Sequence, residues 1–198
     1  DLVAFGTVAD VVPLDHLNRI LVEQGLRRIR QGSCVPGILA LCEVSGRNPQ
    51  RLTTSDIAFY LAPRLNAAGR LEDMSRGIEC LLNDDPAAAA TIARQLDATN
   101  RRRGDITTDM QAQALDHLDR LPRNDGELPF GLCLFDDGWH QGVVGIIAGR
   151  LRETTHRPVI VFAPDRDGRL KGSGRSVDGV HLRDVLAAVA TDHPGLIH

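Results

Sequence analysis

The 198-residue chain is 42% hydrophobic but only 4% aromatic, so it can bury a core of mainly Leu, Ile, Val and Ala, in one domain or two small ones. A formal net charge of −3 is not that of a general nucleic-acid binder, although an acidic protein can still bind DNA through a local basic cleft. The sequence excludes a transmembrane protein, a disulfide scaffold and a cysteine zinc site, because no apolar run approaches roughly 18 residues and the cysteines lack C-x-x-C spacing.

No signal peptide is present, which predicts a soluble, cytoplasmic protein whose cysteines are reduced and buried. The two ends of the sequence are unusual. Asp1 is followed at once by the apolar residues 2–5, and residues 192–198 look like a connection between two elements. Because natural termini are usually polar and loose, we expect the chain to be a fragment of a longer protein.

The first 82 residues predict a mostly helical region. Residues 2–14 mix small and β-branched side chains and predict a buried segment that reaches an edge at Pro13. Apolar residues at helical spacing, together with capping residues, predict four short helices: 17–30, 36–44, 57–61 and 75–82. Pro63 is expected to end the third of them, with residues 64–70 following as a turn-like element.

A long helix is predicted next. Asp84 and Asp85 provide capping carboxylates, and Pro86 suits the first helical turn. From there to Leu121 only Gly104 interrupts the helical pattern. One helix of ~35 residues would extend ~50 Å at ~1.5 Å per residue, a length typical of a rod that joins two domains.

The hydrophobic period changes in the last third of the chain. Residues 122–129 are polar and contain proline, which predicts a loop. The following pattern predicts a strand, a helix, a strand, a turn, a strand and a helix: 130–135, 143–154, 158–163, 165–168, 169–177 and 181–190. A strand, a helix and a second strand in succession predict an α/β unit with a parallel strand pair.

Two glycine-rich elements in this α/β part predict a phosphate-binding site. The first, Trp139–Gly145, opens a helix, and helix N-termini attract anions through their unpaired N–H groups. The second, Lys171–Ser176, presents an arginine that can bind phosphate with two parallel hydrogen bonds. The candidate phosphate contacts are His140, Gly142, Ser173, Gly174 and Arg175.

These residues also have structural interpretations. His140 could cap the helix instead of donating to a phosphate, and Trp139 could either stack on a base or belong to the core. Ser173 and Arg175 could belong to a β-bulge whose arginine is solvated. The basic run 101–103 is more typical of a solvated helix face than of a DNA-binding patch.

Three separated motifs resemble the RecJ-type single-strand-specific exonucleases of the DHH phosphoesterase superfamily. They are G-T-V-A-D-V-V-P-L at 6–14, L-A-P-R-L-N-A-A-G-R at 61–70, and the pair W-H-Q-G-V-V-G-I-I-A at 139–148 and K-G-S-G-R-S at 171–176. Their order and spacing across nearly the whole chain make the match specific. The Asp-His-His cluster of the superfamily is expected before residue 1, and the G-G-H-x-x-A-A-G signature just after residue 198.

The resemblance implies an α/β protein in three parts: the C-terminal part of a DHH catalytic domain at 1–82, a long connecting helix at 83–121, and the N-terminal part of a smaller α/β DHHA1 domain at 122–198. It also implies a metal-dependent 5′→3′ exonuclease that degrades single-stranded DNA in DNA repair and recombination. Single-strand-binding protein is the partner that it suggests. In this family the 171–176 loop helps to hold the 5′ end of the strand.

Asp10 is the candidate metal ligand. A carboxylate in an apolar stretch is costly to bury unless it is paired or metal-bound, although Asp10 could also be a helix cap or a surface residue. The family places its last metal-ligating aspartate at this position, where Mn²⁺ or Mg²⁺ would activate water in a two-metal site. Because Asp10 cannot hold two metals alone, the chain itself is expected to be inactive.

Arg64, Asn66 and Arg70 are the other candidate DNA contacts. Two arginines six residues apart could face one cleft and contact a DNA backbone or a nearby carboxylate. The small residues 67–69 between them leave room for a strand to approach. Alternatively, the arginines support the domain through ion pairs.

Two other functions stay open at this point. One is a DHH/DHHA1 phosphoesterase that acts on short oligonucleotides or nucleotides, against which the 61–70 motif argues. The other is a non-catalytic nucleic-acid-binding relative in the replication machinery. An intact Asp-His-His cluster upstream would indicate catalysis, and a degraded one would indicate binding.

Overall fold

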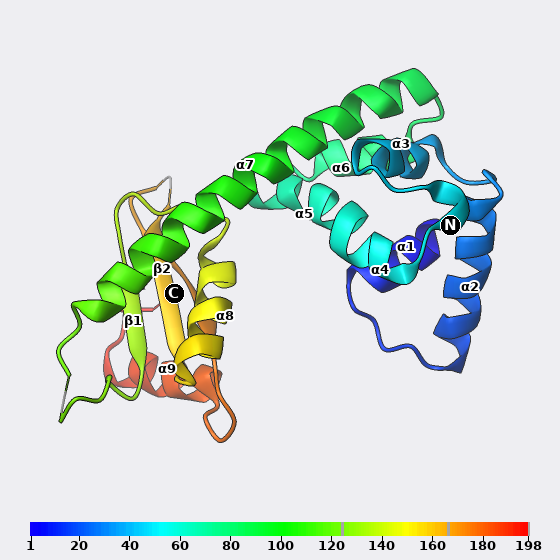
Figure 1. Cartoon of the computed structure of the whole chain (residues 1–198). Helices are drawn as coiled ribbons and strands as arrows, with labels where there is room; N and C mark the ends of the chain where they lie inside the picture. Colours follow the sequence, from blue (N-terminus) through cyan, green and yellow to red (C-terminus); the bar gives the residue numbers. More distant parts are fainter. Residues whose placement is uncertain (124, 166, 198) are drawn as a thin grey trace. The chain divides into compact units, whose positions relative to one another are not determined.

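The computed structural model of the chain describes residues 1–123, 125–165 and 167–197, and it divides into two compact units, 1–104 and 105–198. The first unit is helical and the second is α/β, as predicted, and helix α7 (Pro86–Asp119) contributes to both (Figure 1). The predicted loop at 122–129 and the predicted turn at 165–168 each include one residue outside the described ranges. Within those ranges no helix is long and apolar enough to cross a membrane.

The first unit packs short helices around one apolar core. Before α7 they are α1 (Leu2–Ala9), α2 (His16–Arg30), α3 (Pro36–Val44), η1 (Pro49–Arg51), α4 (Thr54–Asp56), η2 (Ile57–Leu61), α5 (Ala62–Leu71) and α6 (Ser75–Leu82). The core includes Ile29, Leu41 and Leu61, and the first half of α7 adds Ile92 and Leu96 to it. The predicted helices 17–30, 36–44 and 75–82 are therefore confirmed to within one residue.

The first residues, for which a buried segment that reaches an edge is predicted, form a helix. The Asp1 side chain accepts a hydrogen bond from the Leu2 N–H at 2.8 Å and so caps α1. Ala4, Phe5 and Thr7 are buried along α1. The small and apolar residues of this segment thus pack at helical spacing, and the buried part ends before Asp10.

Residues 64–70 are helical rather than turn-like, and Pro63 does not end the preceding helix. Proline in a helix interior removes a donor and its ring clashes with the carbonyl four residues earlier. Here Pro63 lies in the first turn of α5, directly after the π-helical segment η2, where the Ala62 N–H donates to the Ile57 carbonyl five residues back. The wider π turn makes room for the proline ring, and the chain continues as a helix.

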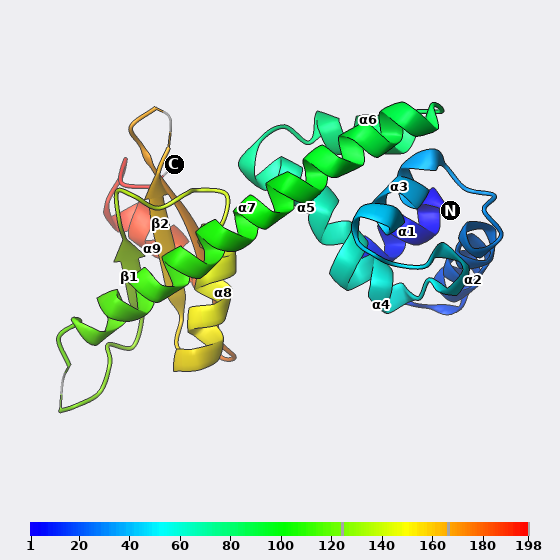
Figure 2. The same ribbon diagram turned by 45° about the horizontal axis from the view of Figure 1, so that its top comes forward.

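The described part of the second unit contains a three-stranded sheet of order β1 (Leu132–Phe135), β2 (Val159–Pro164) and β3 (Leu170–Arg175). Strand β1 is parallel to β2, as predicted, and β3 is antiparallel to β2. Helix α8 (Val144–Thr155) connects β1 to β2, and α9 (Leu182–Asp192) follows β3 (Figure 2). Because side chains alternate along each strand, every residue of β3 belongs to one of two faces.

The cysteines only partly follow the expectation of buried residues. Burial raises the pKa of the Cys42 thiol to about 12 and that of Cys80 to about 11, so both remain neutral at physiological pH. Cys133 is exposed, because it lies on the face of β1 opposite the buried Leu132 and Leu134. The expectation is wrong for this residue.

Gly104 in the middle of α7 gives a first prediction. A Cβ built on Gly104 would meet nothing within 4 Å, so an alanine fits without a clash. Because glycine loses more backbone entropy in a helix than alanine, Gly104→Ala should stabilise the protein by about 1 kcal/mol. We expect the melting temperature, measured by circular dichroism, to rise by about 2–4 °C.

The matched control is Gly149→Ala in α8, where an added Cβ also meets nothing within 4 Å. Both variants should be stabilised by similar amounts. A drop in melting temperature for Gly104→Ala alone would contradict the simple helix-propensity argument.

Candidate nucleic-acid interface

Ser173 and Arg175 lie on one face of β3, the edge strand next to α8. The strand register places them opposite Val161 and Val159 of β2, which are fully buried on the face that packs against α8. The Arg175 guanidinium donates through Nη1 to Ser173 Oγ at 3.2 Å and to the Gly174 carbonyl at 2.8 Å. The two side chains therefore form one polar group at the rim of a buried apolar layer.

Gly145 lets this polar group pack closely against the start of α8. It is the second residue of α8, and a Cβ built on it would lie 3.0 Å from Ser173 Oγ and 3.2 Å from Arg175 Nη2. No side chain caps the N-terminus of α8, whose first N–H groups carry a partial positive charge. A hydroxyl, a guanidinium and a helix N-terminus thus lie close together, and each is a group that can donate hydrogen bonds to phosphate oxygens.

Gly174, a candidate phosphate contact, belongs to the opposite face of β3. A Cβ on Gly174 would lie 2.5 Å from Leu182 of α9, and one on Gly172 would lie 2.6 Å from the Phe162 ring. Both glycines therefore let apolar side chains approach the sheet on the α9 side. The structure gives them a packing role, whereas Gly145 is the glycine that lets Ser173 and Arg175 approach α8.

The loop before α8 fixes the state of the His140 ring. The Gly142 N–H donates to His140 Nδ1 at 3.0 Å, so Nδ1 is an acceptor and the neutral ring carries its proton on Nε2. The His140 carbonyl accepts from the Val143 N–H at 3.1 Å, just before α8 begins. His140 therefore shapes the start of the helix.

Trp139 belongs to the core. Its side chain is only 3% exposed, and the indole Nε1–H donates to Gln113 Oε1 at 2.8 Å. A base could not stack on a ring that is covered in this way. Of the two roles open to Trp139, the structure supports the packing role.

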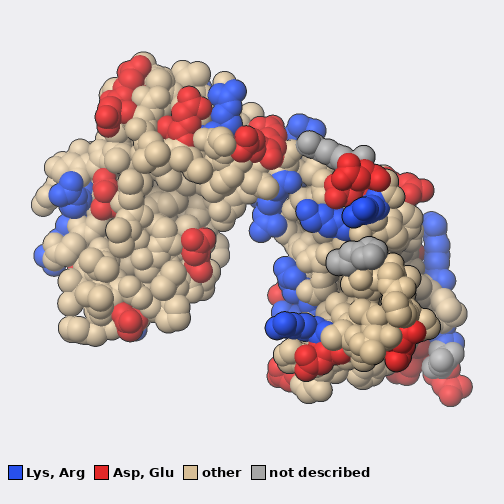
Figure 3. Space-filling model, turned by 180° about the vertical axis from the view of Figure 1, so that it is seen from behind, with Lys and Arg blue, Asp and Glu red and all other residues tan. Residues whose placement is uncertain are grey.

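Charges of both signs are interspersed on the visible face of the second unit (Figure 3). The first unit shows broad areas without charge in the same view. No patch of a single sign dominates this face. If the described residues on this face bind an anion, they do so through a few individual donor groups and not through a broad positively charged surface.

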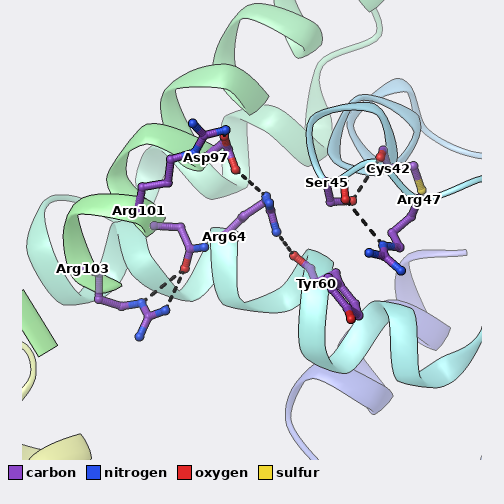
Figure 4. Close-up of polar contacts among 9 residues, drawn as sticks. Cys42, Ser45, Arg47, Tyr60, Arg64, Asp97, Arg101 and Arg103 are labelled. Atoms are coloured by element: carbon purple, nitrogen blue, oxygen red, sulfur yellow. Dashed lines mark hydrogen bonds and ion pairs between the residues drawn. The ribbon is translucent and has the colours of Figure 1, made fainter. Parts of the chain in front are cut away.

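Arg64 forms a buried ion pair instead of projecting into solvent. Its Nε donates to Asp97 Oδ1 at 2.8 Å, and its Nη1 donates to the Tyr60 carbonyl in η2 (Figure 4). The two charged side chains are only 15% and 10% exposed. Arg64 thus ties α5 to α7 and bonds a carbonyl of the π turn, as in the ion-pair alternative raised by the sequence.

The basic run on α7 is partly organised by the same carboxylate. Arg101 Nη2 lies 2.8 Å from Asp97 Oδ2, but the Arg101 side chain is 76% exposed. Arg103 donates through Nε and Nη2 to the Asn100 side-chain oxygen at 3.2 and 3.0 Å (Figure 4). These contacts fit a solvated helix face held by local bonds.

Asn66 and Arg70 are exposed and share one face of α5, since residues four apart lie on the same side of a helix. Arg64 is six residues from Arg70, a rotation of about 240° at 3.6 residues per turn, and it points to α7. The structure therefore separates Arg64 from the other two. Asn66 and Arg70 are the pair available to a strand.

Asp10 is exposed at the C-terminal end of α1, where its backbone N–H donates to the Gly6 carbonyl at 3.0 Å. The burial argument for a metal ligand is therefore wrong for this chain, because water solvates the carboxylate. In the part of the chain that the structure describes, no group of three or more His, Cys, Asp or Glu residues is placed to hold a metal ion. Asp10 alone does not make a metal site.

Comparisons with known proteins agree on one family. The DHHA1 domain model matches residues 129–196. The chain is 58% identical to the single-stranded-DNA-specific exonuclease RecJ of Dickeya dadantii and 55% identical to that of Escherichia coli, with 100% of this chain and 34% of each relative covered. The chain belongs to the RecJ family. It spans about a third of the length of these relatives.

Solved RecJ structures share the fold. The crystal structure of RecJ from Thermus thermophilus in complex with Mn²⁺ matches with a TM-score of 0.80 and 34% identity over 95% of this chain and 26% of that one. A crystal structure of RecJ bound to manganese matches with a TM-score of 0.78 over 93% and 44%. The mostly helical first part, the long helix and the small α/β DHHA1 region are thus established as RecJ architecture.

Sequence reasoning missed four residues that organise this RecJ segment: Asp97, Gln113, His117 and Gly145. Three of them act through partners 19 to 33 positions away along the chain. No local pattern marks such contacts. Gly145 lies within a recognised glycine-rich element, and the alternation of side chains along the predicted strand 169–177 was the signal that could have linked it to Ser173 and Arg175.

Proposed function

We propose that this chain is the strand-holding part of a RecJ-type exonuclease, and that it binds a phosphate of single-stranded DNA between β3 and the start of α8. The observation that carries the proposal is the close approach of Ser173 Oγ and the Arg175 guanidinium to Gly145, the second residue of α8. A phosphate there would accept hydrogen bonds from both groups at the positive end of a helix dipole. His140, in the loop before α8, is a further proposed contact to the phosphate.

We infer that the parent protein degrades single-stranded DNA from 5′ to 3′ in DNA repair and recombination in the cytoplasm. The names of the relatives, which are single-stranded-DNA-specific exonucleases, support this inference. Mn²⁺ or Mg²⁺ is the proposed cofactor, because Thermus RecJ has been crystallised with each. Asp10 would be one ligand among others from elsewhere in the protein. Single-strand-binding protein is the proposed partner.

The proposed parts of the chain remain the DHH segment at 1–82, the connecting helix at 83–121 and the DHHA1 segment at 122–198. On this basis Asn66 and Arg70 of α5 would contact the DNA backbone from the DHH side. Arg64 would act indirectly, by holding α5 against α7 through Asp97.

The proposal predicts binding without cleavage. The 198-residue chain should bind an end-labelled, 5′-phosphorylated single-stranded oligonucleotide more tightly than the 5′-hydroxyl strand. It should release no labelled nucleotide in Mn²⁺, because the described residues offer no metal cluster. Fluorescence anisotropy measures the binding, and gel electrophoresis measures the cleavage.

The two arms of this experiment test separate statements. Robust release of nucleotides that depends on Mn²⁺ and is abolished by a chelator would contradict the inactivity of the chain. Equal affinity for the 5′-phosphate and 5′-hydroxyl strands would contradict the phosphate site. A parallel titration with duplex DNA of the same sequence controls for non-specific electrostatic binding.

A further inference from the structure

One face of α7 contacts three successive parts of the loop that precedes α8. Met110, Gln113 and His117 are three and four residues apart, so they lie on the same side of the helix. All three belong to the second unit, where α7 also bonds α8 through Gln111 and Arg150 (Figure 1). Each of them meets a different residue of the 136–142 loop.

His117 holds the beginning of the loop. Its Nε2 lies 3.1 Å from Asp136 Oδ2, an arrangement that needs a proton on Nε2 because a carboxylate only accepts. The other oxygen of Asp136 accepts from the Gly138 N–H at 2.9 Å, so one carboxylate joins α7 to the loop backbone. The His117 ring also packs edge-on against Trp139, with 5.4 Å between the ring centroids.

Gln113 and Met110 hold the middle of the loop. Gln113 Oε1 accepts from the indole N–H of the buried Trp139 at 2.8 Å. Met110 Sδ accepts from the His140 N–H at 3.4 Å, and the Met110 side chain is buried. A buried tryptophan needs a partner for its N–H, so Gln113 selects the orientation in which Trp139 packs.

We propose that Met110, Gln113 and His117 are positioning residues that set the start of α8 relative to Ser173 and Arg175, and so control phosphate capture. The loop they hold ends in the bonds that begin α8, from Gly142 N–H to His140 Nδ1 and from Val143 N–H to the His140 carbonyl. The inference rests on the proposed phosphate site. A shift of the loop would move Gly145 and the uncapped N–H groups of α8 away from Ser173 Oγ.

Gln113 is the residue to test, because its exposed position tolerates substitution and its single bond to Trp139 can be removed or restored. Gln113→Leu removes the acceptor, whereas Gln113→Glu keeps an acceptor oxygen. Gln95→Leu is the matched control, since Gln95 is also exposed on α7 but belongs to the first unit. The double variant Gln113→Leu/His117→Leu removes two of the three contacts.

Two readouts distinguish positioning from general stability. Trp139 is the only tryptophan of the chain, so its fluorescence emission reports directly on the loop. The ratio of the dissociation constants for 5′-hydroxyl and 5′-phosphorylated single strands reports on the phosphate site. A loss of folded protein would change the active fraction of a sample but not this ratio.

Gln113→Leu should shift the Trp139 emission to longer wavelength and lower the preference for the 5′-phosphate by about 2- to 10-fold, the worth of one hydrogen bond. The double variant should lower the preference further, and Gln113→Glu should restore it to within about twofold of the unaltered chain. Gln95→Leu should change neither readout.

Different failures overturn different statements. If the unaltered chain prefers the 5′-phosphate and Gln113→Leu keeps that preference, the positioning role is wrong while the phosphate site stands. If the unaltered chain binds both strands equally, the phosphate site itself is wrong, and the positioning role falls with it.

Discussion

Replacing Arg175 by alanine should weaken binding of a 5′-phosphorylated single strand by roughly 10- to 100-fold. A hydrogen bond to a charged group contributes about 1.5–3 kcal/mol, and each 1.4 kcal/mol is tenfold in affinity. The Arg175 guanidinium packs against Gly145 at the start of α8 and also donates to Ser173 Oγ, so its removal affects two donors at once. Anisotropy titrations at several salt concentrations measure the loss.

Arg175→Lys and Arg169→Ala are the controls for this prediction. Lysine keeps the charge but cannot bind a phosphate with two parallel N–H groups, so an intermediate affinity is expected. Arg169 is exposed just before β3, and its removal should cost about twofold. Arg175→Ala should also reduce the slope of the logarithm of the binding constant against the logarithm of salt concentration by about one, the value for one phosphate contact. An Arg175→Ala variant that still distinguishes 5′-phosphate from 5′-hydroxyl ends would refute the assignment.

Asp97→Ala should be the most destabilising single change among those considered, with a loss of about 3–5 kcal/mol in the free energy of unfolding. Removing one partner of a buried ion pair leaves the other charge buried and unpaired. Both Asp97 and Arg64 are at most 15% exposed, so water screens the pair little. The melting temperature should fall by roughly 6–20 °C, and urea unfolding followed by circular dichroism gives the free energy directly.

Arg101→Ala tests the same carboxylate from its exposed side. Arg101 is 76% exposed, and surface ion pairs contribute about 1 kcal/mol or less. The double variant Arg64→Met/Asp97→Leu should recover much of the stability lost in Asp97→Ala, because apolar replacements remove both buried charges. If Asp97→Ala were as mild as Arg101→Ala, the ion pair would not be the main support of α5.

Helix positions in this chain follow from local sequence, because caps and apolar spacing act over a few residues. The predicted helix at 36–44 matches α3, and the one from Pro86 is observed as α7, of 34 residues. The strand pairing of β1 and β2 also follows, since a strand, a helix and a strand in succession favour a parallel pair.

Pro63 shows where local reasoning fails. Proline ends most helices, and nothing in the spacing of residues 57–61 indicates a π turn, which is rare. The continuation of the helix through Ala62–Leu71 also changes the meaning of the 61–70 motif. Helical geometry separates Arg64 from Arg70, whereas a turn would have let both face one cleft.

The candidate phosphate site was predictable in its residues but not in its geometry. The strand at 169–177 is predicted and observed as β3, but choosing the phosphate contacts by glycine spacing gives Ser173, Gly174 and Arg175 equal roles. Alternation along the strand sorts them onto two faces. Gly145 lies 28 positions before Ser173 in the sequence, so its close approach to Ser173 and Arg175 appears only when α8 packs on β3.

Helix α7 supplies buried side chains to both units, Ile92 and Leu96 to the first and Met110 and Ala114 to the second. A domain whose core includes part of such a shared helix cannot melt without weakening the helix itself, since helix formation is cooperative. Loss of order in one unit therefore propagates along α7 to the other. The two units are expected to unfold together, and their folding cooperativity is a property of this one helix.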